Sequence, residues 1–298
     1  KSIQYYFTEK YMSLDIQTKR NLELFSAGRF GTGKPLVSII DATKTPMGGR
    51  LLNQWIGQPL LSKTDIENRL NCVEWFTSNQ AILKESASCL AKMSDLERLT
   101  NRLLIKTASP RDILSISESI KVLPFLLELL KNTKNIITQG LLDSVDHCMA
   151  NVNLIDSALA DESNGSQPIF KEGYSVKLDL EKTLLQKGRD YILKLEQKEK
   201  LSTGIKSLKV GFNRIYGYYI EVSKSNLSRI SSRYIRRQTL TNAERFITQE
   251  LKDHERSVLE SEKSIYEMET ILFDDLCDKT SANSLSFLQI AKGIAEID

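Results

Sequence analysis

Two long stretches of the sequence carry apolar residues at intervals of seven. They are Leu178, Leu185 and Ile192 in residues 174–200, and Leu251, Val258, Ile265 and Leu272 in residues 241–278. A stripe with this spacing lies along one side of an α-helix and is typical of a seam between two packed helices. At about 1.5 Å per residue, the two helices are expected to be roughly 40 and 55 Å long. Because they flank a single insertion, we expect an antiparallel pair with the insertion at its far tip.

The insertion between these helices has the alternating pattern of β-strands. Apolar and aromatic residues alternate with others along residues 208–222, on both sides of a central turn at residues 213–217. This pattern predicts a β-hairpin, and residues 234–240 supply a third short extended segment. Thr241 or Asn242 is then expected to cap the returning helix.

The N-terminal half of the chain has helical periodicity. Apolar residues recur at helical spacing through residues 63–104, and Thr45 followed by Pro46 is a strong start for another helix. Gly48 and Gly49 inside that helix indicate the close approach of another backbone. The predicted fold is therefore mainly α, with a helical core and long antiparallel helices that carry a small β-rich unit at the tip.

The same patterns predict the domain boundaries. The helical core takes residues 1–173, and the first long helix, which descends from it, takes residues 174–205. The β-rich unit takes residues 206–241, and residues 242–298 form the returning long helix and the end of the core.

Positive charge is concentrated in the insertion. The whole chain has a formal net charge of +3, yet residues 206–245 contain nine basic and two acidic residues. This segment therefore carries +7 and leaves −4 for the rest of the chain. Such a concentration indicates a surface for a polyanion, and DNA is the best candidate. A basic face that is merely solvated is the alternative.

Several other classes of protein are excluded by the sequence. No run of about 18 apolar residues would span a membrane. No signal-peptide pattern follows Lys1, so we expect a fragment of a larger protein that is cytoplasmic and associated with the nucleoid. None of the four cysteines lies in a CxxC pair, and His147 beside Cys148 is the single metal-like adjacency. We therefore predict reduced thiols and no metal site.

A glycine-rich loop imitates a nucleotide-binding motif. Gly28, Gly33 and Lys34 have the spacing of a P-loop start. Pro35 follows, however, where that motif needs a Ser or Thr hydroxyl for magnesium. Proline also lacks the N–H that a phosphate cradle uses. No nucleophile–base pair occurs elsewhere, so the chain is not expected to be an enzyme on its own.

Five motifs occur in order along the chain. They are Met12–Leu24, Ile39–Leu60, Ile169–Lys182, Ser207–Ser223 and Tyr234–Glu255. The first two resemble the helical core of the MutS family of DNA mismatch-repair proteins, the third its entry into the lever, and the last two its clamp. The resemblance covers nearly the whole chain. It implies a ring-like dimer in which the clamps at the lever tips close around duplex DNA.

The family also implies parts that are not found in this sequence. A mismatch-reading domain with a Phe-x-Glu wedge precedes the family's core, and an ATPase domain that uses ATP and magnesium follows it. Phe7, Thr8 and Glu9 imitate the wedge, but they come directly before the core motif without the expected domain. The chain is therefore expected to hold core, lever and clamp, with no cofactor of its own. Its implied partners are double-stranded DNA, a second subunit of the same type and a downstream repair factor.

The basic and amide side chains of the clamp are the candidate DNA contacts. Arg and Lys make charge-assisted hydrogen bonds to phosphate oxygens, and Asn and Gln add neutral donors. Six of the candidates match the family's clamp motif, whereas Lys224, Arg233 and Arg245 come from residue type and position. The predicted set is Asn213, Arg214, Lys224, Arg233, Arg236, Arg237, Gln238, Asn242 and Arg245. Such contacts predict binding without sequence preference that weakens steeply with salt.

Some of these assignments have structural alternatives. Arg245 could equally form an ion pair with Glu244 or Glu250, and Tyr218, Tyr219 and Ile235 are expected in the clamp core rather than stacked on DNA bases. For the whole chain, the alternative function is a structural or interaction module of a MutS-like recombination protein that lacks mismatch reading. In that case the basic tip would be incidental.

Overall fold

The protein is described by a computed structural model. It covers residues 10–27, 33–131, 136–160, 169–213 and 217–298 of the 298-residue chain. These residues divide into two compact units, Lys1–Ile169 with Asp274–Asp298, and Phe170–Phe273. None of the helices within the described residues is both long enough and apolar enough to cross a membrane.

The first unit is built from helices. Ile113, Ile116 and Ile120 recur at helical spacing on one face of α7 and are fully buried, and this helix packs against α8. Phe287 and Ile290 of α11 are fully buried as well, and α11 packs on α8, α3 and α6. The helices are α1 (Ile16–Asn21), α2 (Leu36–Ile40), α3 (Pro46–Gly57), α4 (Lys63–Ser78), α5 (Gln80–Leu90), α6 (Leu96–Leu104), α7 (Pro110–Leu130), α8 (Ile136–Ala158) and α11 (Ser284–Ile297).

The start of α3 was correctly predicted, but the reason for its glycines was not. Thr45 Oγ1 accepts a hydrogen bond of 3.0 Å from the Gly48 N–H, and Pro46 is the first helical residue. A Cβ at Gly48 would collide with the Asp298 carboxylate. This carboxylate accepts hydrogen bonds from the Lys44 and Thr45 N–H groups at 2.8 and 2.7 Å. The close neighbour is therefore an acidic side chain, which a helix N-terminus favours, and not another backbone.

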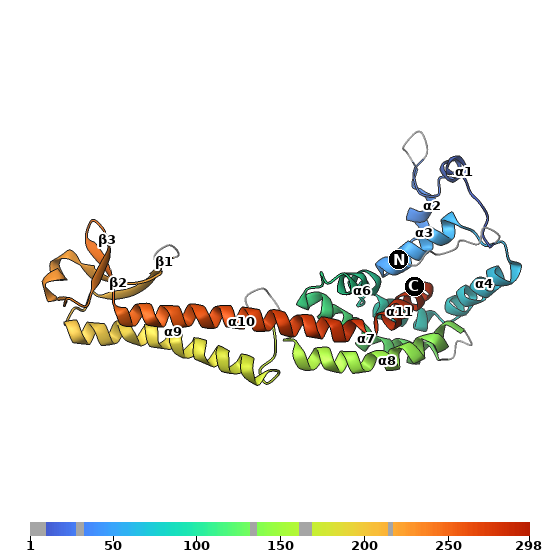
Figure 1. The fold of residues 1–298 in the computed structure, drawn as a ribbon. Helices are drawn as coiled ribbons and strands as arrows, with labels where there is room; N and C mark the ends of the chain where they lie inside the picture. Colours follow the sequence, from blue (N-terminus) through green and yellow to red (C-terminus); the bar gives the residue numbers. More distant parts are fainter. Residues whose placement is uncertain (1–9, 28–32, 132–135, 161–168, 214–216) are drawn as a thin grey trace. The chain divides into compact units, whose positions relative to one another are not determined.

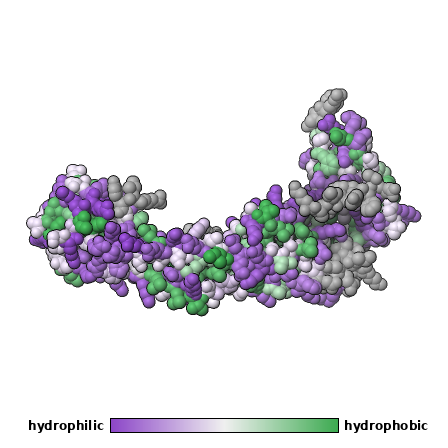
Figure 2. All heavy atoms as spheres, in the orientation of Figure 1, coloured by the Kyte–Doolittle hydropathy of each residue, from purple (hydrophilic) through white to green (hydrophobic). Residues whose placement is uncertain are grey.

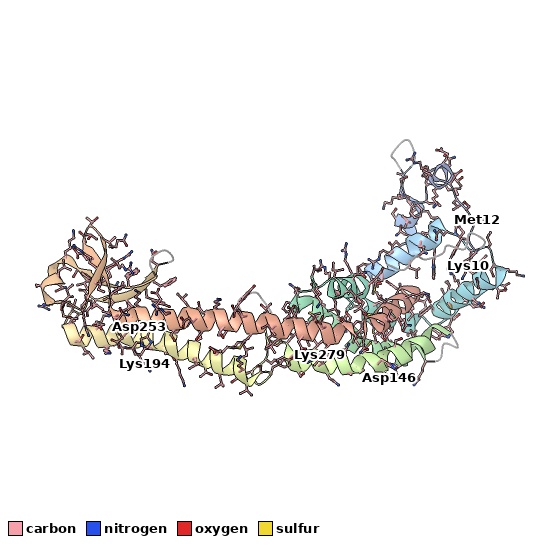
Figure 3. The ribbon with its side chains drawn as sticks, in the orientation of Figure 1. Lys10, Met12, Asp146, Lys194, Asp253 and Lys279 are labelled. Atoms are coloured by element: carbon pink, nitrogen blue, oxygen red, sulfur yellow. The ribbon has the colours of Figure 1, made fainter. Side chains whose placement is uncertain are left out.

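The second unit contains the predicted pair of antiparallel helices. Helix α9 (Val176–Thr203) and helix α10 (Gln249–Ser281), which belongs to this unit up to Phe273, lie side by side (Figure 1). Three ion pairs fix their alignment: Lys182–Glu269 at 2.9 Å, Arg189–Glu262 at 2.8 Å and Lys198–Glu250 at 2.8 Å. Residue numbers rise along α9 while those of its partners fall, so the helices run in opposite directions. Lys194 and Asp253, labelled in Figure 3, mark the part of the pair nearest the sheet.

The predicted seam is buried at four of its seven positions. Leu178, Ile192, Leu251 and Val258 are at most 4% exposed, whereas the other three are half-buried. Gly188 allows close approach, because a Cβ there would lie 2.9 Å from Cγ2 of Val258. The seven-residue repeat therefore identified the packed side of both helices, as expected for a seam between two helices.

The clamp is a four-stranded antiparallel sheet with strand order β1-β2-β4-β3. The predicted hairpin is confirmed, since Val210 pairs with Ile220 and Phe212 with Tyr218. A short 3-10 helix, η1 (Lys224–Arg229), follows the hairpin. The strands are β1 (Lys209–Asn213), β2 (Gly217–Ser223), β3 (Ile235–Thr239) and β4 (Ala243–Ile247). The structure thus confirms a mainly α fold with a small β region.

The prediction that a helix starts at Thr241 or Asn242 is wrong. Both residues lie in the turn between β3 and β4, and α10 begins only at Gln249. Its cap is Thr248, whose Oγ1 accepts a hydrogen bond of 3.2 Å from the Leu251 N–H. Pairing with β2 and β3 overrides the helical propensity of this segment, because it buries Glu244, Phe246 and Ile247 of β4. The sheet therefore extends beyond the clamp boundary that was predicted at residue 241.

One face of the sheet forms a small core with the two helices. Ile220, Val222 and Phe246 from the sheet pack with Leu195 of α9 and Leu251 of α10. All five side chains are at most 4% exposed. The opposite face is left for polar groups, as expected for an antiparallel sheet covered on one side.

Candidate nucleic-acid interface

Carboxylates from both helices fix the sheet through its backbone. The Val210 N–H on the outer edge of β1 donates to Glu196 Oε2 of α9 at 3.0 Å. The Tyr218 N–H of β2 donates to Glu255 Oε1 of α10, also at 3.0 Å. Gly217 has φ +75°, and a Cβ there would collide with the Glu255 carboxylate, so this position requires glycine. The basic residues of the clamp are therefore carried on a sheet that is tied to α9 and to α10.

Arg233 is bound to a buried carboxylate. Glu199 of α9 is fully buried, and its Oε2 accepts hydrogen bonds from Arg233 Nη2 at 2.5 Å and from the Tyr234 hydroxyl. Burial and the bond to Glu199 raise the pKa of Tyr234 to about 12. The bond to Tyr234 and the charge of Glu199 raise the pKa of Arg233. A buried carboxylate needs a partner, so the structure uses Arg233 as the counter-ion of Glu199.

Arg236 is paired more loosely. Its Nη1 lies 3.4 Å from Glu244 Oε1, and Glu244 is buried in β4. The Arg236 side chain remains 64% exposed. The contact is at the outer limit of hydrogen-bonding distance, so most of the guanidinium still faces solvent.

Arg245 lies on the sheet face opposite the core. Its Nε donates to Glu221 Oε2 of β2 at 3.0 Å, and its Nη1 donates to Gln238 Oε1 of β3 at 3.0 Å. Its guanidinium also stacks on the Tyr219 ring, 4.1 Å from the centroid. These contacts form one polar row across three strands. We refer to Arg233, Arg236 and Arg245 as the paired arginines.

Both alternatives for the partner of Arg245 are wrong. Glu244 pairs with Arg236, and Glu250 pairs with Lys198. Of the three residues predicted to lie in the clamp core, only one is found there. Tyr218 packs against the core cluster as predicted, whereas Tyr219 lies on the other face beneath Arg245 and Ile235 is 53% exposed. The two tyrosines differ because they are consecutive residues of β2, and neighbouring residues of a strand point to opposite faces of the sheet.

Arg237 lies in a β-bulge. Arg236 pairs with Phe246 and Gln238 pairs with Arg245, so Arg237 has no residue opposite it. It is exposed, and it makes no ion pair with any residue that the structure describes. A bulge redirects its side chain away from the regular ladder. It therefore presents its guanidinium to solvent without a competing carboxylate.

The register places the remaining predicted residues at two ends of the sheet. The Lys224 N–H donates to the Asn242 carbonyl at 3.1 Å, so these two residues lie together where β2 ends and β4 begins. Asn213 lies at the opposite end, where β1 ends. With seven residues in β2, the two ends are roughly 20 Å apart. Arg214 lies outside the described residues.

Two cations that the sequence analysis did not select lie in the segments that flank the β1–β2 hairpin. Lys206 precedes β1 and Arg229 ends η1, and both are exposed. Neither forms an ion pair with a described residue. We refer to Lys206, Lys224, Arg229 and Arg237 as the unpaired cations. Figure 2 shows hydrophilic side chains over much of the sheet on the face that it displays.

The residues that the structure describes hold no group of three or more His, Cys, Asp or Glu side chains able to bind a metal ion. Pro35 is the N-cap of the five-residue helix α2, so the residue after Lys34 offers no hydroxyl to a nucleotide-bound magnesium. Gly28 of that motif and the wedge-like Phe7–Glu9 segment lie outside the described residues. The described part of this loop does not fit ATP.

Comparisons with known proteins give matches over nearly the whole chain. The family model described as MutS domain III matches residues 17–298. A relative from Bacillus cytotoxicus, named DNA mismatch repair protein MutS, is 39% identical over 302 residues, which cover 99% of this chain and 34% of the relative. A relative of the same name from Caldicellulosiruptor bescii is 37% identical over 299 residues, which cover 99% of this chain and 35% of the relative.

These relatives are about three times as long as the chain, which spans roughly a third of each. The match includes the helical unit, both long helices and the sheet. It is nearly complete for this chain and rests on a family model as well as on individual relatives. The chain therefore belongs to the MutS family.

Proposed function

We propose that this chain is the part of a MutS-type mismatch-repair protein that holds duplex DNA through its phosphates. Positive side chains without protein partners bind phosphate oxygens, and such contacts carry no sequence information. The proposed contacts are Arg237 and Lys224, with amide donors from Asn242 and Gln238. Asn213, Arg214 and the exposed part of Arg236 extend the set to the rest of the sheet.

The bulge at Arg237 carries this proposal. A cation on a regular strand would have a cross-strand neighbour, as Arg245 has in Glu221. Arg237 has none, is exposed, and adjoins two further polar residues of β3. A guanidinium in these surroundings loses no ion pair when it binds a phosphate, so its full charge is available to the ligand.

The paired arginines have a different role in this proposal. Arg233 neutralises Glu199, and Arg245 links three strands through Glu221 and Gln238. Moving either arginine to a phosphate would leave a carboxylate of the clamp without its partner. We therefore assign Arg233 and Arg245 to the shape of the clamp rather than to direct contact with DNA.

Duplex DNA binding by an Arg237→Gln/Lys224→Gln variant tests the proposal. Affinity is measured by fluorescence anisotropy over a series of salt concentrations with a labelled duplex of arbitrary sequence. Removing two phosphate contacts is expected to lower the salt slope by about 1.8 and to weaken binding about 25-fold. A duplex of different sequence is expected to give the same affinities.

Lys187→Gln/Lys194→Gln is the matched control. Both lysines are exposed on α9 and make no ion pair with a described residue, so this variant loses the same charge away from the sheet. It is expected to keep the parental salt slope. Equal losses in both variants would show that net charge alone matters, and absence of binding by the parent chain would refute the proposal.

The remaining properties of the family are also proposals for the full-length protein. They are ATP and magnesium in a separate ATPase part, a second subunit of the same type, and a downstream repair factor. The alternative, a structural module of a recombination protein, is not favoured, because the similar relatives carry the mismatch-repair name.

A further inference from the structure

Helix α4 of the first unit has an apolar side that faces solvent. None of its 16 residues is buried, although six of them are apolar. Ile66, Leu70 and Val73 are the most exposed of these, at 39, 59 and 58%. They are spaced at i, i+4 and i+7, so they form one line along the helix, and we call them the α4 stripe. Helices of this length usually owe their stability to a packed apolar face, so the exposed stripe indicates a surface that another molecule covers.

The opposite side of α4 makes its contacts with the rest of the unit. The helix packs against α5, and Cys72 and Phe76 on this side are half-buried. The Arg69 guanidinium lies 3.7 Å from the centroid of the Trp55 ring of α3. In Figure 1, α4 lies at the margin of the first unit. The α4 stripe is therefore free to receive a partner without any change in the packing of the helix.

The charges that border the α4 stripe are negative. If Leu70 is placed at position a of a heptad, the two other members of the stripe are at d, and the e positions are Glu67 and Glu74. Both glutamates are exposed. Glu67 lies 3.6 Å from Lys63 in an exposed pair, which is a weak interaction, and Glu74 has no ion pair among the described residues. Positions of type e select the partner of a packed helix by charge.

These charges exclude a second copy of α4 as the partner. In an antiparallel pair the e positions of the two helices face each other, so Glu67 of one copy would meet Glu74 of the other and repel it. A parallel pair would need Arg69 at position g to reach Glu74 of the other copy. Arg69 is stacked on Trp55 and is not available for that contact. The surface therefore suits a helix with basic residues beside its apolar side.

Helix α10 offers an internal comparison. Leu259 and Tyr266 are exposed at the same spacing of seven, and each is followed by a glutamate, Glu260 and Glu267. Lys263, however, lies between them at the position that Leu70 holds in α4, and it pairs with Glu267 at 3.6 Å. The acidic border is thus present in α10 without a continuous apolar line. This difference separates the contribution of charge from that of the α4 stripe.

We propose that the α4 stripe is a docking surface for an amphipathic helix of another protein. The apolar side of that helix packs on the stripe, as in other helix-mediated contacts with anchors at i, i+4 and i+7. Its basic residues pair with Glu67 and Glu74. The site lies outside the sheet and does not involve DNA, so the inference goes beyond the proposed function and is independent of it.

A synthetic helix of about three heptads, with leucine at a and d and lysine at e and g, is the probe. Its twin has glutamate in place of lysine. Binding to the 298-residue chain is measured by fluorescence anisotropy of the labelled peptide at low salt. The lysine probe is expected to bind about tenfold more tightly than the glutamate probe. Leu70→Ser/Val73→Ser should weaken its binding by about tenfold or more. Leu259→Ser/Tyr266→Ser, the matched control on α10, should bind as the parent does.

Charge reversal tests the partner's chemistry. Glu67→Lys/Glu74→Lys is expected to prefer the glutamate probe, whereas Glu260→Lys/Glu267→Lys, with the same change of charge and the same spacing, should keep the parental preference. All these positions are exposed, and the urea unfolding midpoint of each variant verifies its fold. Equal binding of the two probes by the parent, or no binding of the lysine probe, would overturn the inference.

Sedimentation and duplex binding separate the inference from its alternatives. If the parent chain dimerises and Leu70→Ser/Val73→Ser abolishes the dimer, a second copy covers the α4 stripe and the inference is wrong. A monomeric parent that binds the lysine probe supports it. Duplex DNA affinity should be the same in Leu70→Ser/Val73→Ser as in the parent, so failure of the proposed function and failure of this inference are distinguishable.

Discussion

The paired arginines and the unpaired cations have similar charge but different surroundings. Arg233 neutralises a fully buried Glu199, and Arg245 lies in a polar row with Glu221 and Gln238. Arg237 and Lys224, by contrast, have no ion pair among the described residues. The paired group lies along the strands and their helix contacts. Three of the four unpaired cations lie in the segments that flank the β1–β2 hairpin, and the fourth, Arg237, lies in the bulge of β3. Position relative to carboxylates separates the cations with a structural partner from those that are proposed to bind phosphate.

This difference follows from the cost of burying charge. Glu199 is removed from water, so loss of Arg233 would leave an uncompensated carboxylate in the clamp. Lys224 is exposed, and its proposed interaction with a phosphate would replace water and counter-ions instead of a protein partner. The paired arginines should therefore control stability, and the unpaired cations should control binding. Each of the following variants tests that separation.

The largest effect is expected for Arg233→Gln. The variant leaves Glu199 buried without its cation and should lower the free energy of unfolding by about 3 kcal/mol. Urea denaturation measures this loss. At a temperature where the variant is folded, its salt slope for duplex binding should equal that of the parent. If the salt slope instead falls by about 0.9 and the variant is not destabilised, Arg233 contacts phosphate and does not belong with the structural arginines.

Tyr234→Phe tests the same site through its pH dependence. In the folded protein burial and the bond to Glu199 raise the pKa of Tyr234 to about 12, from an ordinary value near 10. The folded state thus retains the proton that the unfolded state loses first, so stability falls as the pH rises from about 10 to 12. That loss is about 2 kcal/mol and should be absent in Tyr234→Phe.

The control for this comparison is the same pair at pH 8. There, Tyr234→Phe should be less stable by about 1 kcal/mol, since Glu199 loses one hydrogen bond. The two unfolding free energies should converge above pH 10 and cross near pH 11, because the parent loses about 2 kcal/mol that the variant keeps. Parallel curves throughout the alkaline range would show that Tyr234 does not titrate differently in the folded state.

The sequence predicted the helices better than it predicted the roles of the charges. The repeats at Leu178 and Val258 identify packed helix faces because that information is local and periodic. Thr248 is of a residue type that caps helices, but Asn242 is of such a type as well and comes six positions earlier, so the helix was predicted to start there. Strand β4 was missed because its strand character comes from pairing with β2 and β3, and pairing depends on distant residues.

The same limit applies to the candidate site. Counting charges located the basic segment correctly in the sheet, but nothing local links Arg233 to Glu199, which lies 34 positions earlier. Nor does local sequence distinguish Arg236 from Arg237, since only the bulge separates their surroundings. Uncharged residues such as Ser207 and Asn226 carried no charge signal. The hydrogen bonds that join them are visible only when the segment before β1, the end of β2 and η1 are placed together.

Arg237→Gln is expected to have the clearest effect on binding by a single residue. Loss of one phosphate contact should lower the salt slope by about 0.9 and weaken duplex binding about fivefold. Its free energy of unfolding should stay within about 0.5 kcal/mol of the parent, as for other exposed positions. Arg233→Gln provides the reciprocal control. If Arg237→Gln is destabilised and its DNA binding is unchanged, Arg237 has a structural role and the proposed difference between Arg233 and Arg237 is wrong.

The smallest effect is expected for Glu244→Gln, which should convert a paired arginine into an unpaired one. Arg236 is already 64% exposed and lies 3.4 Å from its carboxylate, so little holds it in place. Removing the negative charge frees the guanidinium at the edge of the proposed DNA surface. Affinity should rise about twofold, with a salt slope steeper by up to about 0.9. Glu260→Gln on α10 removes the same charge from an exposed acid that has no ion pair in the described chain, and it should leave the slope unchanged. If Glu244→Gln instead weakens binding, the carboxylate positions Arg236 for phosphate, and pairing alone would not distinguish the two groups of cations.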